Sequence, residues 1–242
     1  MVVYSVIIPA YNEENYLPRT LDTLHAAMAA IDPPGEIIVV DNNSTDATAE
    51  IARRRGTRVV FEKINQISRA RNAGAMHARA ENLLFLDADT LISAELLERA
   101  LDNLQQEDCC GGGATVSPDR PLESLYQIGL HVWNRLSVKL GLAAGSFVYC
   151  RKDGFEAVGG FSEKVYVGEE IWFSISYGKW GKAHGQKFKI IDHTPVITST
   201  RKLDWYSKFQ TFTFLLSMMF FPFISRYRFL CRFWYRRPSD GR

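Results

Sequence analysis

The sequence predicts an α/β fold: one domain around a central sheet whose strands are mostly parallel. Two features of the first ninety residues indicate this. Four short runs rich in Val, Ile, Leu and Phe alternate with stretches of helical periodicity, and Asp41 and Asp87 stand where two of those runs end. Strands that alternate with helices form parallel sheets, and ligands bind such sheets beyond the carboxyl ends of the strands. We therefore expect a binding site at that end.

The expected strands of the first half are YSVIIP (4–9), EIIVVD (36–41), TRVVFE (57–62) and NLLFLD (82–87). They are nearly continuous in apolar residues, as strands buried on both faces are. The helices expected between them cover 13–31, 46–55 and 67–79. Ser44, Thr45 and Asp46 are each able to cap the second helix, and Ser93 is the expected cap of the helix after residue 90.

The second half is less regular. Strands are expected at 111–117 and 146–150, and helices at 122–140 and 168–182. Neither an internal repeat nor a low-complexity linker interrupts the chain. We therefore expect one domain over residues 1–200, followed by a tail over 201–242.

Composition and cysteine usage narrow the class of protein. A chain of 242 residues with 46% hydrophobic and 23% charged residues can bury a sizeable core. The four cysteines have neither paired CxxC spacing nor the density of a disulfide scaffold, which favours a reducing, cytoplasmic setting. The N-terminal apolar run has no basic leader and meets Pro9 early, so it predicts a first strand and not a signal peptide.

Charge is distributed unevenly along the chain. Residues 201–242 hold 9 basic and 2 acidic residues, a balance of +7, whereas residues 1–200 are net −5 although the whole chain is +2. Because only the tail is basic, nucleic acid is not an expected partner.

The tail also has an apolar pattern. Its large apolar residues first recur at helical spacing, at Trp205, Phe209, Phe212, Leu216 and Met219, and the run to Ile224 is then apolar all round. This run is shorter than the about 20 residues that span a bilayer. Arginines interleaved with aromatics follow it, which predicts a helix over 203–237 lying on the inner face of the cell membrane. A helix pair that closes the domain, or a homodimer interface, is the alternative.

Two carboxylates, Asp87 and Asp89, follow the buried run 82–87 with one residue between them. Extended geometry would point both the same way, and a cation or protons would be needed to relieve the repulsion between them. Mg²⁺ and Mn²⁺ take carboxylate oxygens together with phosphate oxygens. The alternative is an acidic cap for the next helix, for which Ser93 is better suited.

Charged residues at two further helix starts are candidate site residues. Arg69 and Arg71 lie in SRARNAGA, and a guanidinium fork suits phosphate or ribose oxygens; exposed, solvated arginines are the alternative. Glu169 and Glu170 lie in YVGEEIW. There they suit the helix dipole, but either carboxylate is also able to take a proton from an attacking hydroxyl.

Five motifs in order, from Ser5 to about Tyr177, resemble those of family 2 glycosyltransferases: SVIIPAYNEENYLPRTLDTL, IIVVDNNSTDAT, SRARNAGA, LLFLDADT and VGGFSEKVYVGEE. The resemblance implies a GT-A type, Rossmann-like domain. It also implies a nucleotide-sugar donor, a divalent metal (Mn²⁺ or Mg²⁺) and transfer with inversion at the anomeric carbon.

The resemblance also implies roles for individual residues. Asp89 would be the principal metal ligand, and Asp87 would contact the ion or the ribose. Glu170 would be the catalytic base, with Glu169 binding the acceptor or sharing the role. The residues implied to bind the donor are Pro9, Ala10, Tyr11, Glu13, Asp41, Arg69, Arg71, Asp87 and Ala88.

The chain departs from the family pattern at three places. Asn42 and Asn43 stand where a second Asp and a Gly are usual, and Asn tolerates the left-handed conformation that Gly would supply. Glu-Glu replaces Glu-Asp at the expected base. Ser199 stands where many members have a metal-binding histidine, which leaves the third ligand unassigned although His193 is near.

These observations predict an inverting glycosyltransferase that moves sugar from a UDP-sugar to a hydroxyl of a glycan or lipid-linked acceptor of the cell envelope. We expect a donor half over about 1–117 and an acceptor half over about 118–200, with the acceptor pocket around 145–161. One alternative is a sugar nucleotidyltransferase, although PAYNEE stands where such enzymes have a Gly-rich loop. The other is a non-catalytic binding or scaffold protein that kept the fold.

Overall fold

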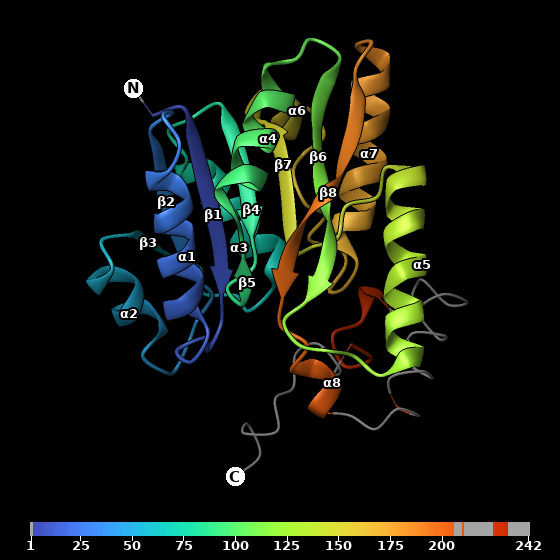
Figure 1. Cartoon of the computed structure of the whole chain (residues 1–242). Coiled ribbons are helices and arrows are strands. Elements are labelled where there is room, and N and C mark those ends of the chain that lie inside the picture. Colours follow the sequence, from blue (N-terminus) through green and yellow to red (C-terminus); the bar gives the residue numbers. More distant parts are fainter. Residues whose placement is uncertain (1, 206–209, 211–224, 232–242) are drawn as a thin grey trace.

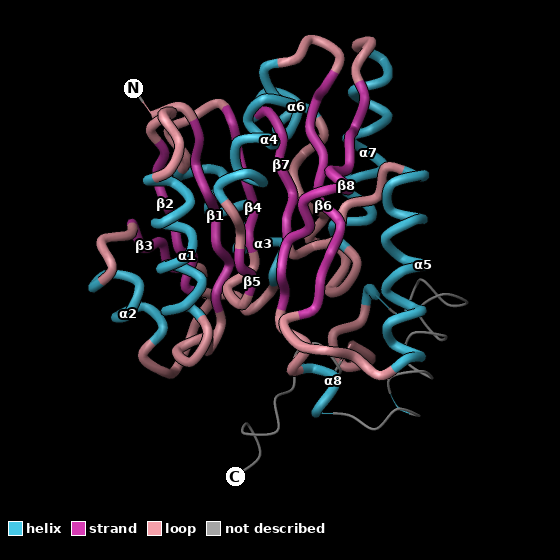
Figure 2. The backbone as a smooth tube through the Cα atoms, in the orientation of Figure 1, coloured by secondary structure: helices cyan, strands magenta, loops and turns pink. Residues whose placement is uncertain are grey.

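A computed structural model describes residues 2–205, 210 and 225–231 of the chain. Eight strands form one mixed sheet in the order β3-β2-β1-β4-β7-β6-β8-β5, with helices on both faces (Figures 1 and 2). The predicted single α/β domain with a mostly parallel sheet is confirmed.

The first half supplies four strands that pair in parallel with one another. Its strands are β1 (Tyr4–Ala10), β2 (Gly35–Asp41), β3 (Arg58–Phe61) and β4 (Asn82–Leu86), and its helices are α1 (Leu17–Ala29), α2 (Thr48–Arg54) and α3 (Ile67–His77). Each predicted element of this half is present. The N-cap residue of α2 is Ala47 and none of the three candidates, although Asp46 Oδ1 accepts the Thr48 N–H at 3.0 Å.

The second half contains β5 (Thr90–Leu91), α4 (Ala94–Gln105), β6 (Cys109–Pro118), α5 (Ser124–Leu140), β7 (Phe147–Arg151), α6 (Lys152–Ala157), α7 (Glu169–Ala183), β8 (Lys187–Thr198) and α8 (Lys202–Trp205). Ser93 caps α4, as expected, by accepting the Leu96 N–H. The sequence analysis did not foresee β5, α6 or β8. Half-exposed and charged residues interrupt the apolar pattern of β8, because this strand lies near the edge of the sheet.

Alternation along β1 divides the core between the two faces of the sheet. Val6 and Ile8 pack with α1 and α4, whereas Ile7 packs with α3 and α7 on the other face. A run of stacked rings strengthens the second cluster, with Phe161 and Phe173 centroids 4.5 Å apart. This packing fixes the start of α7, where Glu169 and Glu170 lie.

The stretch 145–161, around which we expected the acceptor pocket, contains both buried and exposed residues. Residues 147–151 are β7, which pairs with β4 and β6 inside the sheet, and Phe155 and Phe161 are buried. Gly145, at the start of this stretch, lies beside Arg71 and Glu170. The position of the acceptor pocket stays a prediction.

Most of the tail pattern, including Phe209, Phe212, Leu216 and Met219, lies outside the described residues. The described segment 225–231 is joined to the domain, since Ser225 C=O accepts the Tyr166 N–H at 2.6 Å. Within the described part of the chain, no helix combines the length and the apolar character that crossing a bilayer requires.

Candidate active site

Several of the predicted site residues lie at the carboxyl ends of β1, β2 and β4, the lower end of the sheet in Figure 1. Ala10 and Asp41 are register partners there, so the loops after β1 and β2 leave the sheet side by side. The two loops are tied together, because Asn12 Oδ1 accepts the Thr45 N–H at 2.8 Å and Asn12 N–H donates to Ser44 Oγ at 3.0 Å.

Asp41 is the last residue of β2 and is 7% exposed, with Oδ1 accepting the Ser44 N–H of the following turn at 2.9 Å. Asn43 has φ = 68°, so it takes the left-handed conformation expected in place of Gly. Asn42 is buried and holds the segment before α3: its Nδ2 donates to Ile64 C=O at 2.6 Å, and its Oδ1 accepts the Gln66 N–H at 2.8 Å.

Arg71 is the centre of the site. Its side chain is buried; Nη2 donates to Asp87 Oδ1 at 2.9 Å and to Gly145 C=O at 2.7 Å, while Nη1 donates to Glu169 Oε1 at 2.7 Å. Burial acts to lower the pKa of Arg71, but the carboxylates of Asp87 and Glu169 outweigh it and leave the pKa above its ordinary value. One guanidinium thus joins α3, β4 and α7.

Glu170 lies beside this cluster. Gly145 is close to it: a Cβ added there would fall 3.4 Å from Glu170 Cδ and 3.3 Å from Arg71 Nη2. Burial, and then the charge of Glu169, raise the pKa of Glu170 to about 8. A carboxyl group with such a pKa exchanges its proton near neutral pH, as a general base must.

Asp89 lies in a second ion cluster with Glu13 and Arg201. Arg201 Nη1 and Nη2 bond the two carboxylate oxygens of Glu13 at 2.7 and 2.6 Å, and Nη2 lies 3.0 Å from Asp89 Oδ2. Residues 87–89 are not extended, because Thr90 N–H donates to Asp87 C=O and closes a turn. The carboxylates of Asp87 and Asp89 therefore pair with two different arginines.

The other predicted site residues surround these clusters. Pro9, Ala10 and Ala88 are buried, and Tyr11 follows β1. Arg69 is partly exposed and pairs with Glu163 at 2.5 Å and with Glu62 at 3.5 Å. Direct contacts of all these residues with a donor stay predictions. The His193 side chain is 84% exposed, and its Nε2 lies 3.1 Å from Asp192 Oδ1.

The sequence analysis missed Arg201, Gln66 and Asn72. Asn72 clamps Phe161 by donating to its C=O and accepting its N–H, both at 2.9 Å. Gln66 Nε2 donates to Glu163 C=O and Val165 C=O. Both side chains hold the loop before α7. Gln66 and Asn72 belong to the segment around SRARNAGA. This motif indicated a functional segment, but it did not indicate that these side chains hold a loop.

The carboxylates of Asp87 and Asp89 fit a divalent metal by their chemistry. Mg²⁺ is commonly held by one or two carboxylates together with phosphate oxygens of the substrate. Among residues 2–205, 210 and 225–231, no three His, Cys, Asp or Glu side chains gather around one point. Two carboxylates match the number of protein ligands that such an ion commonly takes.

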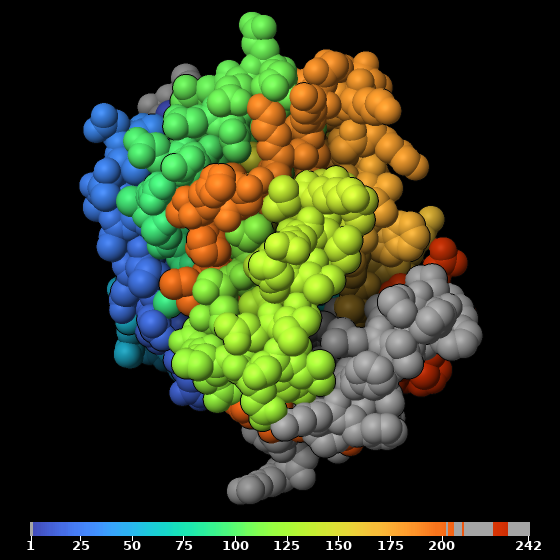
Figure 3. Space-filling view, turned by 45° about the vertical axis from the view of Figure 1, so that its right-hand side comes forward, coloured from blue at the N-terminus to red at the C-terminus, as the bar shows by residue number. Residues whose placement is uncertain are grey.

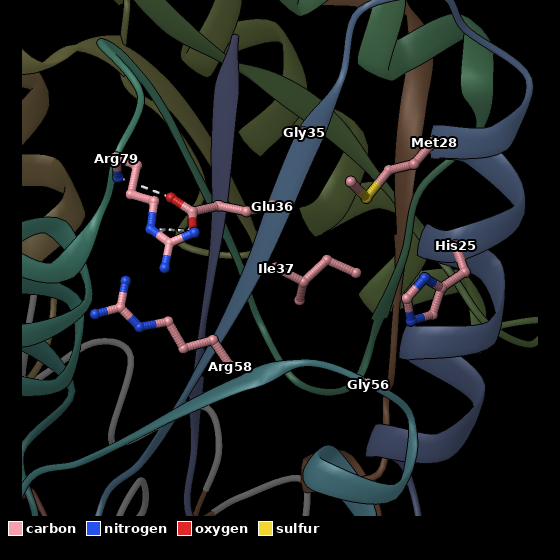
Figure 4. Close-up of a pocket in the computed structure, with 8 residues that line it drawn as sticks. All are labelled: His25, Met28, Gly35, Glu36, Ile37, Gly56, Arg58 and Arg79. Carbon is pink, nitrogen blue, oxygen red and sulfur yellow. Dashed lines mark hydrogen bonds and ion pairs between the residues drawn. The ribbon is translucent and has the colours of Figure 1, made fainter. Parts of the chain in front are cut away.

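A hollow of about 570 Å³ lies at the opposite end of the sheet, between α1 and the start of β2 (Figure 4). Glu36 accepts the Arg79 N–H there at 2.7 Å, and His25 and Arg58 line the wall. This hollow is at the amino ends of the parallel strands, where α/β sheets do not usually bind ligands.

Known proteins resemble this chain in sequence. The family model described as Glycosyl transferase family 2 matches residues 5–158. An uncharacterized glycosyltransferase of Mycobacterium tuberculosis is 34% identical over 122 residues, which cover 50% of this chain and 51% of that protein. The chain thus matches about half the length of this relative.

Solved structures share the fold. The mannosyltransferase from Pyrobaculum calidifontis in complex with GDP-Man and Mn²⁺ has a TM-score of 0.67 at 18% identity, covering 95% of this chain and 64% of that one. TarS 1–349 of S. aureus in complex with UDP-GlcNAc has a TM-score of 0.61 at 21% identity, covering 82% and 59%. At these identities the likeness is one of fold. The family model spans more than half of the chain, and the chain therefore belongs to glycosyl transferase family 2.

Proposed function

We propose that this protein transfers a sugar, with inversion, from a UDP-sugar held with Mn²⁺ or Mg²⁺ to a hydroxyl group of a glycan or lipid-linked acceptor. The observation that carries the proposal is the cluster in which Arg71 brings Asp87 and Glu169 together beside Glu170, at the carboxyl end of the sheet. Arg71 thereby holds Asp87, which is expected to contact the sugar donor, close to the candidate base Glu170.

The donor is proposed to lie across the ends of β1, β2 and β4. Asp41, with Pro9, Ala10 and Tyr11, would face the base, and Ala88 and Asp87 would face the ribose. Arg71 would act by orienting Asp87, while Arg69 would approach the donor from the edge. The nucleotide sugars bound to the two structural relatives support a donor of this class.

We assign to Glu170 the role of the base that accepts the proton of the acceptor hydroxyl. Glu169 is held by Arg71 at 2.7 Å and would orient the acceptor. A divalent metal, when bound through Asp89 and Asp87, would neutralise the charge that develops on the leaving diphosphate. Inversion follows from direct attack on the face opposite that leaving group.

Release of UDP from a panel of UDP-sugars, measured with Mn²⁺ and candidate acceptors, tests the proposal. Glu50→Gln is a matched control for Glu170→Gln, because Glu50 is an exposed acid on α2 that pairs along its helix with Arg54. Pyrophosphate release from UTP would instead identify a nucleotidyltransferase. Failure to turn over any nucleotide sugar would favour the non-catalytic alternative.

We further propose that the protein works on an anionic membrane surface through residues 203–237, at the cytoplasmic face. The outward face of α5 supports this, because Leu125, Ile128, Val132 and Leu136 recur at helical spacing and are 44–71% exposed. Figure 3 shows α5 lying along the surface of the molecule. A soluble helix usually carries charge on such a face.

Charge favours lipid as the partner of this surface. Ser124–Leu140 contains no Asp or Glu but has Arg135 and Lys139, and exposed Tyr227 and Phe229 stand beside Arg226 and Arg228. Anionic headgroups would neutralise these cations. In a homodimer, a self-paired α5 face would instead bring like charges together.

A further inference from the structure

We propose that Arg201 is the internal counter-ion of Asp89, which a divalent cation must displace, so that the cation binds tightly only together with a nucleotide. The inference rests on the proposed function, because it takes Asp89 as the metal ligand. It concerns a residue that lies beyond the matched segment 5–158.

The contacts of Arg201 place its charge at Asp89. The side chain is 8% exposed, forks onto both oxygens of Glu13 and approaches Asp89 Oδ2 to 3.0 Å. The ring centroids of Tyr16 and Trp205 lie 4.1 and 5.6 Å from its Cζ. A full positive charge is thus held between two carboxylates at the predicted metal site.

Two cations cannot share the Asp89 carboxylate without strong repulsion in a partly buried site. Free Mn²⁺ would have to displace the guanidinium from Asp89 or bind beside it, and both arrangements weaken its affinity. A nucleoside diphosphate brings the negative charge that compensates the cation and Arg201 together. Metal and donor are therefore expected to enter as one unit.

Arg201 is better placed to move than Arg71. Arg71 also donates to the backbone carbonyl of Gly145 in the interior, whereas Arg201 stands between the end of β8 and the four-residue helix α8. The buried Nε of Arg201, like that of Arg71, donates to no acceptor in the described part of the chain, so the difference between the two arginines rests on their positions. The guanidinium of Arg201 is incompletely bonded where it lies, which reduces the cost of a second position.

Mn²⁺ binding measured by electron paramagnetic resonance, with no nucleotide present, tests the inference on the full-length protein. Arg201→Met removes the cation from Asp89 and Glu13, and we expect it to bind Mn²⁺ at least about tenfold more tightly than the wild type, because the repulsion is gone. UDP should then increase Mn²⁺ affinity far more in the wild type than in the variant. Equal affinities without nucleotide would overturn the inference.

A purely structural role for Arg201 predicts a different pattern. In that case Arg201→Met would lower the melting temperature with or without Mn²⁺, whereas a counter-ion role predicts that Mn²⁺ alone restores it. Arg201→Lys keeps the charge and should keep weak nucleotide-free binding; it also serves if Arg201→Met does not fold. A Lys variant that binds free Mn²⁺ as tightly as a folded Met variant would contradict the proposal.

Two further variants locate the effect. Arg120→Met is a matched control, because Arg120 bonds Asp204 of α8 and Thr200 but not Asp89, and it should behave as the wild type. Adding Asp89→Asn to Arg201→Met should remove the gained site. If it does not, the gained Mn²⁺ binds elsewhere and the inference fails.

The outcome separates this inference from the proposed function. If Arg201→Met binds Mn²⁺ tightly without nucleotide while the wild type transfers no sugar, the counter-ion role is supported and the transferase function is rejected. Sugar transfer by a wild type whose Mn²⁺ affinity matches that of Arg201→Met would reject the counter-ion alone.

Discussion

At the scale of single residues, two arginines pair with different carboxylates of the site. Arg71 holds Asp87 and Glu169, and Arg201 holds Asp89 and Glu13. Glu170 stands beside the first of these pairs and has a pKa raised to about 8 by burial and by Glu169. The two aspartates of one short motif therefore have different electrostatic environments, and their substitutions should have different effects.

The protonation of Glu170 should set the pH dependence of transfer. Below a pKa of about 8 the carboxyl group holds its proton and cannot accept another, so kcat/KM should rise about tenfold per pH unit and level off above 8. Glu170→Gln should keep donor affinity, lower transfer by about 10²–10⁴-fold and lose this profile. Steady-state rates from pH 6 to 9.5 measure it. An unchanged profile in Glu170→Gln, with loss in Glu169→Gln, would move the role to Glu169.

Asp89→Ala should abolish Mn²⁺-dependent donor binding, because one carboxylate cannot hold an ion that also bridges a diphosphate. Asp87→Ala should weaken donor binding less, but it should also lower stability, since buried Arg71 loses one of its partners. Calorimetric titration of UDP with and without Mn²⁺ measures the first effect, and thermal unfolding the second. Metal-dependent turnover that survives in Asp89→Ala would refute the assignment of Asp89.

Among the elements, α3 organises the site. Arg71 and Asn72 on this helix, with Gln66 just before it, reach β4, the loop before α7, and α7 itself. The motif SRARNAGA therefore holds the start of α7, where the candidate base lies. We infer that its buried side chains position the carboxylates of the site and the loop before α7.

Arg71→Lys should destabilise the fold despite keeping the charge. An ammonium group cannot reproduce the planar fork that reaches Asp87, Glu169 and Gly145 together. A loss of about 3–5 kcal/mol in the free energy of unfolding is expected, the usual effect of breaking a buried ion pair. Urea denaturation measures it.

Arg69→Lys is the control for that experiment. It lies two residues earlier on the same helix, its side chain is 31% exposed, and its pairs with Glu62 and Glu163 should contribute no more than about 1 kcal/mol. Equal losses in the two variants would show that the fork of Arg71 has no special role.

At the scale of the whole molecule, the carboxyl end of the sheet and the tail belong to the same region. Arg201 contacts the Trp205 ring, Arg120 bonds Asp204, and Ser225 bonds the backbone of Tyr166 in the loop before α7. The described parts of the tail are thus attached next to the site. A tail that binds a membrane would place that site near a lipid-linked acceptor.

The full chain should float with liposomes that contain anionic lipid and lose this binding as salt rises, because cations contribute to it. Ile128→Glu with Val132→Glu should weaken flotation by placing acids on the outer face of α5. Truncation after Arg201 should leave a chain that stays in the aqueous fraction and still binds donor. A full chain that ignores liposomes and elutes as a dimer would support the alternative interface.

Sequence alone determined the first four strands, the three helices between them and the acids at their ends. Buried parallel strands are local, continuous apolar runs, and their shared direction places Asp41 and Asp87 at one edge. The left-handed turn at Asn43 and the Ser93 cap were equally predictable, because each depends on the chemistry of one residue and its neighbours.

Tertiary structure alone decided which charges meet. Arg71 pairs with Glu169 across 98 residues of sequence, and Arg201 with Glu13 across 188, and no local pattern encodes either contact. The strand β8 was also hidden, since it lies near a sheet edge and its apolar pattern is interrupted. Residue types gave the chemistry available, whereas the packing of distant segments decided which carboxylate each arginine neutralises.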